Sequence, residues 1–282
     1  MEKEISVIVP FCDDARDVGK CVDALDSQTI SKDRFEIIMV DNNSRDGSAG
    51  IVRKFPGIKL VSEPKQGAYA ARNRGLAEAG GMICAFTDAD CVPFTDWLEK
   101  IEEAMRPPDV GIVQGGVRYD SGSTPLSLLA AYEEEKMKSI FSSSREDLYY
   151  AYAGNMAVRK KIFDRLGPFQ ETGRGADSVF MNRAVKEFSC DIVRYSAGIL
   201  VLHSEIKNVW KYYEKQFVYG RSNRRKRKFT SFRSLTPTER FQLYQKTIRN
   251  GKLFPMQSAL LFLLIGAGAV CYRLGQMSEC RR

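Results

Sequence analysis

The chain has 282 residues, of which 44% are hydrophobic and 28% charged, so it is long and apolar enough to fold around a sizeable core. The formal net charge of +8 suits a partner with phosphates or an anionic membrane surface. The seven cysteines include no CxxC pair and no zinc-ligand spacing, which argues against a zinc-binding domain and favours reduced thiols in the cytosol. The N-terminus, MEKEISVIVP, lacks the features of a signal peptide.

Short apolar runs alternate with helical patterns through the first 118 residues. The runs predict buried strands at residues 5–10, 35–40, 58–62, 82–86 and 110–117. Helices are predicted after Asp13 and Asp14, before Pro56, at residues 67–79 and at residues 95–105. This alternation predicts an α/β fold with a parallel sheet, right-handed crossovers and helices on both faces.

Polar residues follow three of these strands, after Pro10, Val40 and Phe86. Because the carboxyl ends of parallel strands meet at one edge of the sheet, these polar residues should form a single nucleotide-sized cleft. The chain contains neither a GxGxxG nor a GxxxxGKS or GxxxxGKT motif. A dinucleotide-binding Rossmann site and a P-loop are therefore disfavoured.

Two carboxylates, Asp88 and Asp90, follow the strand predicted at residues 82–86. Aimed at one point they would repel each other unless a cation lay between them. Oxygen ligands suit Mg²⁺ or Mn²⁺, which in turn hold phosphate oxygens. The alternative is an Asp-rich turn that caps the next helix, since acidic residues favour turns and N-caps.

Four motifs occur in one order along the chain: SVIVPF, VDNNSRDGS, KQGAYAARNRG and FTDADC. Together they resemble a family 2 glycosyltransferase of bacterial or archaeal type, over about residues 4–220. The resemblance implies the GT-A fold of nucleotide-diphospho-sugar transferases, with a Rossmann-like, mostly parallel sheet and flanking helices. It also implies an inverting, metal-dependent transfer of a sugar from a nucleoside diphosphate, with UDP favoured, to a hydroxyl of a glycan or lipid-linked acceptor.

The resemblance assigns roles to five residues of the first half. Pro10 should lie against the nucleotide, and Asp41 should accept a hydrogen bond from uracil. Arg72 should approach the nucleotide, for which its rigid fork of donors is suited. Asp90 should bind Mn²⁺ or Mg²⁺ directly, while Asp88 faces the ribose or the donor sugar. A turn acid at position 41 and a solvated helix charge at position 72 are the structural alternatives.

Two residues of the second half are also site candidates. Asp177 precedes a helical pattern and matches the general base of the family, although the Glu that usually comes before it is replaced by Ala176. A helix N-cap is the alternative role for Asp177. His203, the only histidine, follows an apolar run and matches a third metal ligand of some relatives. A structural histidine is the alternative.

The C-terminal part contains twenty residues without a charge, 253–272, which reach about 30 Å as a helix. The basic run at residues 224–228 lies upstream and suits an anionic cytoplasmic leaflet better than nucleic acid. We therefore expect a C-terminal anchor, transmembrane or interfacial, that holds the enzyme at the cytoplasmic face of the cell membrane. A buried C-terminal helix is the alternative.

These patterns divide the chain into three parts. Residues 1–220 form the GT-A domain, with a nucleotide-binding half at 1–118 and an acceptor half at 119–220. Residues 221–252 are a basic, membrane-adjacent segment, and residues 253–272 are the membrane helix. Two other functions stay open: a non-catalytic membrane scaffold with the same fold, and a sugar-phosphate nucleotidyltransferase. The latter would need a glycine-rich basic loop after the first strand, where FCDDARD stands.

Overall fold

The computed structural model describes residues 3–119, 123–171, 174–204, 206–226, 229 and 231–278, without the side chains of 224–226. The basic run at 224–228 thus lies outside the described side chains. Within the described part, one sheet has the strand order β3-β2-β1-β4-β7-β6-β8-β5. The strands are β1 (Ile5–Phe11), β2 (Phe35–Asp41), β3 (Lys59–Ser62), β4 (Ile83–Thr87), β5 (Cys91–Pro93), β6 (Ile112–Tyr119), β7 (Asn155–Arg159) and β8 (Val193–His203).

The first four strands are parallel and alternate with helices, as the sequence predicted. The helices are α1 (Val18–Asp26), α2 (Ser48–Val52), α3 (Ala68–Glu78) and α4 (Trp97–Met105). Val7 and Val9 of β1 belong to the core that α1 and α4 cover, whereas Ile8 belongs to the opposite core with α3. Both faces of the sheet are therefore buried, which explains the continuous apolar runs.

The middle of the sheet contains the antiparallel pairs of an arrangement that was expected to be mostly parallel. Strand β7 lies between β4 and β6 and is antiparallel to both, so β6 is not the neighbour of β4. The three-residue edge strand β5, which pairs antiparallel with β8, was not predicted. The sheet is thus mixed, with its parallel half carrying the motifs of the first 90 residues.

Asn155, at the start of β7, ties the strands together in the interior. It is 1% exposed, and its side chain accepts a hydrogen bond from Trp97 Nε1 at 2.8 Å. Its amide group donates to the carbonyls of Gly116 and Ile199, at 2.7 and 2.9 Å. Since a buried amide must have all its partners, this network fixes β6, β7, β8 and α4 in one arrangement.

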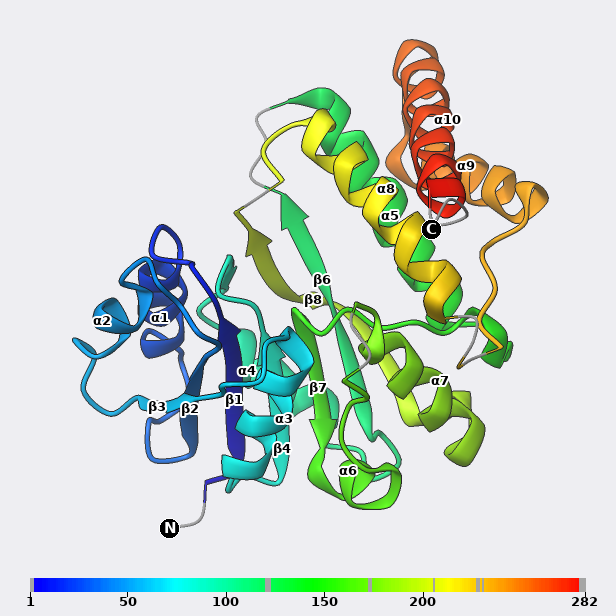
Figure 1. The fold of residues 1–282 in the computed structure, drawn as a ribbon. Coiled ribbons are helices and arrows are strands. Elements are labelled where there is room, and N and C mark those ends of the chain that lie inside the picture. Colours follow the sequence, from blue (N-terminus) through cyan, green and yellow to red (C-terminus); the bar gives the residue numbers. More distant parts are fainter. Residues whose placement is uncertain are drawn as a thin grey trace.

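The remaining long helices are α5 (Thr124–Phe141), α8 (Val209–Lys226), α9 (Pro237–Gly251) and α10 (Pro255–Ser278), while α6 (Lys160–Leu166) and α7 (Ala176–Phe188) pack on the sheet core. These long helices lie to one side of β6 and β8, with α5 and α8 next to the strands and α9 and α10 on the far side of these two helices (Figure 1). Helices α8 and α10 approach closely at glycines. A Cβ on Gly220 would lie 1.9 Å from the carbonyl oxygen of Tyr272, and one on Gly275 would lie 2.0 Å from that of Phe217.

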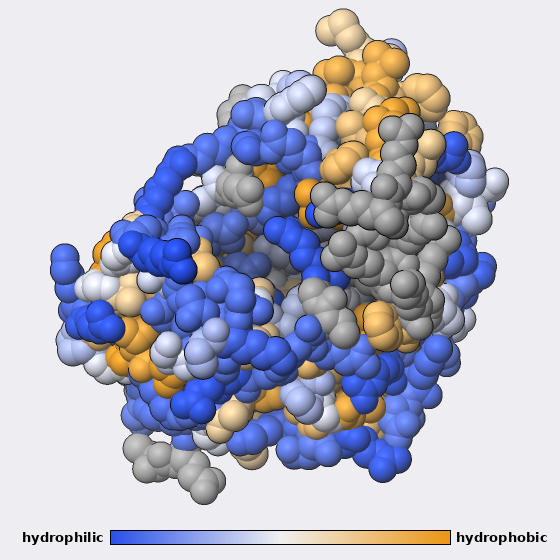
Figure 2. Space-filling model, viewed as in Figure 1, coloured by the Kyte–Doolittle hydropathy of each residue, from blue (hydrophilic) through white to orange (hydrophobic). Residues whose placement is uncertain are grey.

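Helix α10 is long and apolar enough to cross a membrane, with a mean hydropathy of 1.7. It includes most of the segment predicted at residues 253–272. One side packs on α5, α8 and α9 through Leu261 and the glycines, and the other is exposed. Met256, Leu263 and Met277 are 84%, 68% and 66% exposed, and Figure 2 shows this apolar surface at the edge of the molecule.

Gly75 in α3 and Gly50 in α2 provide a matched test of the packing of helices on the sheet. A Cβ on Gly75 would lie 2.4 Å from Cγ2 of Ile8, whereas one on Gly50 would meet nothing within 4 Å. We expect Gly75→Ala to lower the free energy of unfolding by about 1–3 kcal/mol through overpacking. Gly50→Ala should leave it unchanged or raise it by up to about 1 kcal/mol, because alanine favours helix. Urea unfolding of both variants measures the difference; equal effects would contradict the packing described.

Candidate active site

A cavity of about 940 Å³ opens between the carboxyl edge of the parallel strands and the helices α5, α8 and α10. Six of the seven residues predicted from the sequence line it: Pro10, Arg72, Asp88, Asp90, Asp177 and His203. The seventh, Asp41, is not among the described lining residues; its carboxylate accepts a hydrogen bond from the backbone nitrogen of Ser44 at 3.0 Å. Its neighbour Asn42 lines the cavity instead.

The loops after β1 and β2 are bound to each other, so the polar strand ends meet as predicted. The backbone nitrogen of Asp14 donates to Ser48 Oγ at 2.9 Å, and that of Arg45 donates to Asp13 at 2.6 Å. Asn42 then holds the start of α3, because its side-chain oxygen accepts from the backbone nitrogen of Gly67 at 2.7 Å. These contacts position α3, which carries Arg72, against the end of β4.

Arg72, which is buried, and Asp88, which is half-buried, form an ion pair in the cavity wall. Arg72 is 5% exposed, and its guanidinium lies over the ring of Tyr69, 4.9 Å from the ring centre. Burial, the largest single effect, lowers the pKa of Arg72, but the interactions with Asp88, Tyr69 and Asp177 together outweigh it and the net shift is upward. Nε of Arg72 is buried without a hydrogen-bond partner among the described residues.

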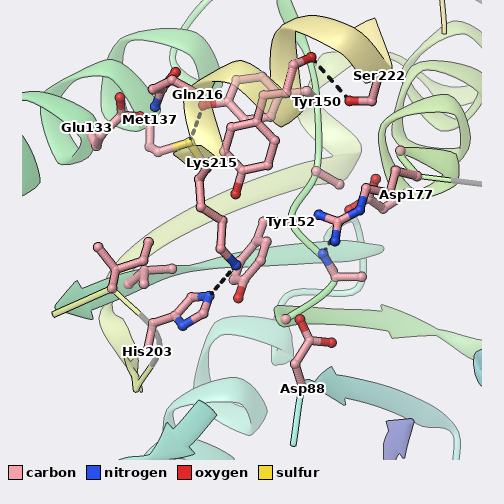
Figure 3. Close-up of a pocket in the computed structure, with 18 of the residues that line it drawn as sticks. Asp88, Glu133, Met137, Tyr150, Tyr152, Asp177, His203, Lys215, Gln216 and Ser222 are labelled. Carbon is pink, nitrogen blue, oxygen red and sulfur yellow. Dashed lines mark hydrogen bonds between the residues drawn. The ribbon is translucent and has the colours of Figure 1, made fainter. Parts of the chain in front are cut away.

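His203 is the last residue of β8 and lies beside Asp90. Figure 3 shows the histidine among the residues that line the cavity. Its Nδ1 lies 3.6 Å from Oδ2 of Asp90, and its Nε2 lies 3.4 Å from the ammonium of Lys215 on α8. The ring stacks on Tyr152 with 6.4 Å between centres. An ammonium can only donate, so Nε2 accepts, and in the neutral ring Nδ1 carries the proton.

Asp90 and His203 offer an oxygen and a nitrogen donor that fit a divalent cation. Their two atoms and the sulfur of Cys91 lie within 4.8 Å of one another. Burial raises the pKa of the Cys91 thiol well above its usual range, so it stays protonated, a poor metal ligand. Donors at about 2.1 Å around an octahedral ion lie roughly 3 Å apart, so the 3.6 Å separation needs only a small closing movement. A carboxylate suits Mn²⁺ or Mg²⁺, and an imidazole beside it favours Mn²⁺.

Asp177 stands on the opposite wall of the cavity, in the first turn of α7 (Figure 3). Gly175 precedes this helix with φ of 95°, a conformation that favours glycine. The Asp177 carboxylate is 8% exposed and accepts hydrogen bonds from the backbone nitrogens of Ala153 and Ser178, at 3.1 and 2.7 Å. The helix N-terminus and these donors hold a carboxylate in place beside the cavity.

The family of the chain follows from its first 167 residues. A model of the family described as Glycosyl transferase family 2 matches residues 6–167, more than half of the chain. The chain belongs to glycosyl transferase family 2. The resemblance stated from the four sequence motifs is thereby confirmed.

Other glycosyltransferases match part of this family 2 chain. Glycosyltransferase AglE of Haloferax volcanii is 34% identical over 172 residues, which cover 58% of this chain and 55% of that protein. Cholesterol galactosyltransferase of Borreliella burgdorferi is 35% identical over 114 residues, covering 39% of this chain and 31% of that protein. The chain therefore spans about half, or less, of the length of these curated relatives.

Two solved structures have a similar GT-A fold. The mannosyltransferase PcManGT of Pyrobaculum calidifontis, in complex with GDP-mannose and Mn²⁺, has a TM-score of 0.62 at 19% identity, covering 96% of this chain and 74% of that one. Glucosyl-3-phosphoglycerate synthase of Mycobacterium tuberculosis, with Mn²⁺ and UDP-glucose, has a TM-score of 0.54 at 18% identity, covering 71% of each chain. The predicted fold class of this glycosyltransferase is thus confirmed.

Several cavity residues of the glycosyltransferase were not predicted from the sequence. Asp14 follows β1, and burial, with the charges of Asp90, Asp46 and Asp88, raises its pKa. Tyr152 and Lys215 complete the wall around His203. Asp14 carried a sequence signal, because it belongs to a polar cluster at a strand end.

Gly154 tests the geometry around Asp88. A Cβ at this position would lie 2.3 Å from the Tyr152 ring and 2.7 Å from Oδ2 of Asp88, whereas one on Gly198 would have only contacts near 4 Å. Gly154→Ala should therefore displace the carboxylate and slow sugar release from nucleotide sugars by up to about 10²-fold, because displacements near 1 Å have such effects. Gly198→Ala is the control, and steady-state assays with thermal unfolding separate activity from stability. Unchanged activity in Gly154→Ala would show that Asp88 does not need this position.

Proposed function

We propose that this chain is an inverting, divalent-metal-dependent glycosyltransferase that takes a sugar from a nucleoside diphosphate. The observation that carries the proposal is the placement of two strand-end carboxylates, Asp88 and Asp90, in one cavity with the carboxylate of Asp177 on the opposite wall. A cation and the diphosphate would fit at Asp88 and Asp90, and a base would fit at Asp177 on the opposite wall. The sugar would lie between them.

Asp90 and His203 are the residues that would hold Mn²⁺ or Mg²⁺. A bound divalent ion would stabilise the charge on the leaving diphosphate. Arg72, which lines the cavity, would donate to the nucleotide and keep Asp88 oriented toward the ribose or the donor sugar. Preorganised donors of this kind lower the barrier because they need no rearrangement during the reaction.

Asp177 is the general base in this proposal. It would accept the proton of the attacking acceptor hydroxyl while that oxygen forms its bond to the anomeric carbon and the bond to the diphosphate breaks. Attack from the face opposite the leaving group gives inversion, as the family resemblance implies. Ala176 is buried at 2% exposure and leaves Asp177 as the acid of this turn.

The donor proposed is a UDP-sugar, with Pro10 against the nucleotide and Asp41 as the acceptor for uracil. Support for a nucleotide sugar comes from neighbours of the same fold that bind UDP-glucose and GDP-mannose. Because Asn42 rather than Asp41 lines the cavity here, uracil binding requires the loop after β2 to present Asp41. Both nucleotides therefore belong in the first binding experiments.

The acceptor proposed is a glycan or a lipid-linked molecule. The cavity continues past Asp177 along α5 and α8 to Gly268 and Tyr272 of α10, so one end lies beside the apolar helix. We infer a division into a GT-A domain at 1–220, with nucleotide and acceptor halves meeting at residue 118, a basic segment at 221–252 and a membrane helix at 253–272. The exposed apolar side of α10 fits a helix at the cytoplasmic membrane surface.

The two competing functions make different predictions. A scaffold would not bind a nucleotide in a metal-dependent way, whereas calorimetry with UDP and Mn²⁺ detects such binding in an enzyme. A sugar-phosphate nucleotidyltransferase would need basic residues after β1, where the structure has the acidic loop with Asp13 and Asp14. Family membership favours the glycosyltransferase.

Two substitutions separate the proposed roles of the carboxylates. Asp90→Asn should abolish the strengthening of UDP binding by Mn²⁺, because it removes the charged ligand. Asp177→Asn should keep donor binding but lower transfer by about 10²-fold or more, the usual contribution of a general base. Calorimetry and a sugar-release screen with UDP-sugars and GDP-mannose measure the two effects. Asp96→Asn, at a half-buried position before α4 that pairs with Lys100 outside the cavity lining, is the control. Wild-type transfer in either site variant would refute the assignment.

The apolar side of α10 provides a test of membrane binding. We expect the double variant Leu263→Asn, Val270→Asn to bind vesicles of phosphatidylglycerol and phosphatidylcholine at least about tenfold more weakly, because each exposed side chain loses its transfer to lipid. Phe94→Asn, an exposed apolar position outside α10, is the control. Vesicle co-sedimentation measures the affinities. Equal binding of all three proteins would mean that α10 does not contact the bilayer.

A further inference from the structure

Lys215 is a cation inside the cavity that has no part in the four sequence motifs or in the mechanism above. It projects from α8 across the cavity, and its ammonium lies 3.4 Å from Nε2 of His203 (Figure 3). The other nitrogen of the same ring faces Asp90 at 3.6 Å. One imidazole thus separates an ammonium from the carboxylate proposed to hold the metal.

This position conflicts with a metal ion on His203. A divalent ion between Asp90 and Nδ1 would leave a double and a single positive charge on the two sides of one ring. Their repulsion is strong in a partly buried site. Binding through Nδ1 also uses the lone pair of that nitrogen, so the ring proton moves to Nε2, which then no longer accepts a hydrogen bond from Lys215. The Lys215 contact and the metal therefore exclude each other.

An anion beside the metal resolves the conflict. A lysine ammonium sits on a flexible four-carbon stem, so it can leave His203 without any movement of α8. The group that needs a cation at this point is the diphosphate, which the proposed function places at the metal. A charge-assisted hydrogen bond to a phosphate oxygen is stronger than the contact with a neutral imidazole.

We propose that Lys215 is a phosphate-binding residue that leaves His203 when a nucleoside diphosphate and the metal bind together. This inference rests on the proposed function and adds a residue to it. Lys215 opposes the metal in the absence of nucleotide and supports the nucleotide in the presence of metal. Metal and nucleotide therefore strengthen each other's binding through this side chain, by the same factor in both directions.

Lys211, one helical turn earlier on α8, offers a matched control. It is exposed, and its ammonium pairs with Glu214 on the same helix at 2.7 Å. Lys215→Met and Lys211→Met remove the same charge from the same helix, but only the first changes the contact with His203. The binding of Mn²⁺ alone is measured by electron paramagnetic resonance, and that of UDP and GDP by calorimetry with and without Mn²⁺.

Lys215→Met should bind Mn²⁺ alone at least about fivefold more tightly, because a like charge is gone. It should bind the diphosphate in the presence of Mn²⁺ at least about tenfold more weakly, because a charge-assisted hydrogen bond is lost. Lys211→Met should match the wild type within about twofold in both measurements. A merely structural role for Lys215 would weaken both ligands together, so tighter Mn²⁺ binding distinguishes the two.

The absence of either effect in Lys215→Met overturns the inference. If the wild type binds UDP or GDP with Mn²⁺ while Lys215→Met behaves as Lys211→Met does, only the role of Lys215 fails. If the wild type binds neither nucleotide with Mn²⁺, the proposed function fails and this inference fails with it. Thermal unfolding of each variant confirms that the comparison is between folded proteins.

Discussion

Repulsion between carboxylates at the carboxyl edge of β1 and β4 is the constraint on which the site depends. Asp14, Asp88 and Asp90 line one end of the cavity, and burial together with the neighbouring charges raises the pKa of Asp14. Such a cluster costs stability unless cations compensate it. Arg72 compensates Asp88 by a partly buried ion pair, and Asp90 lies beside His203. The acidic cluster therefore favours a cation beside Asp90, and in the proposed function the divalent ion that accompanies the diphosphate would supply it.

The sequence predicted the parallel half of the sheet well because its strands are buried on both faces and read as continuous apolar runs. It did not predict that β7 lies between β4 and β6. That placement depends on Asn155, whose side chain bonds to Trp97, Gly116 and Ile199, residues 39 to 58 positions away. Periodicity carries no information on such long-range pairs. The edge strand β5 has three residues and is too short to show a pattern.

Within the site, the sequence indicated which residues line the cavity where a residue follows a strand inside a motif. It did not do so where the orientation of the side chain decides whether the residue faces the cavity. Asp88 and Asp90 end a buried strand, so their place was readable. At the end of β2 neighbouring side chains point to opposite sides, and the cavity has Asn42 where Asp41 was expected. Lys215 lies on a helix with Lys211 a turn earlier, and only the packing of α8 decides which lysine enters the cavity.

Helix α8 connects the cavity to the apolar surface of α10. On one side it presents Lys215 to His203, and on the other its backbone contacts α10 at Gly220 and Gly275. A Cβ at either glycine would collide with the backbone of the other helix. The two helices therefore pack at a distance that leaves no space for a side chain at these positions. The exposed apolar side of α10 is therefore fixed relative to the cavity by helix packing. A membrane that binds α10 would orient the cavity as well, with its far end at the lipid surface.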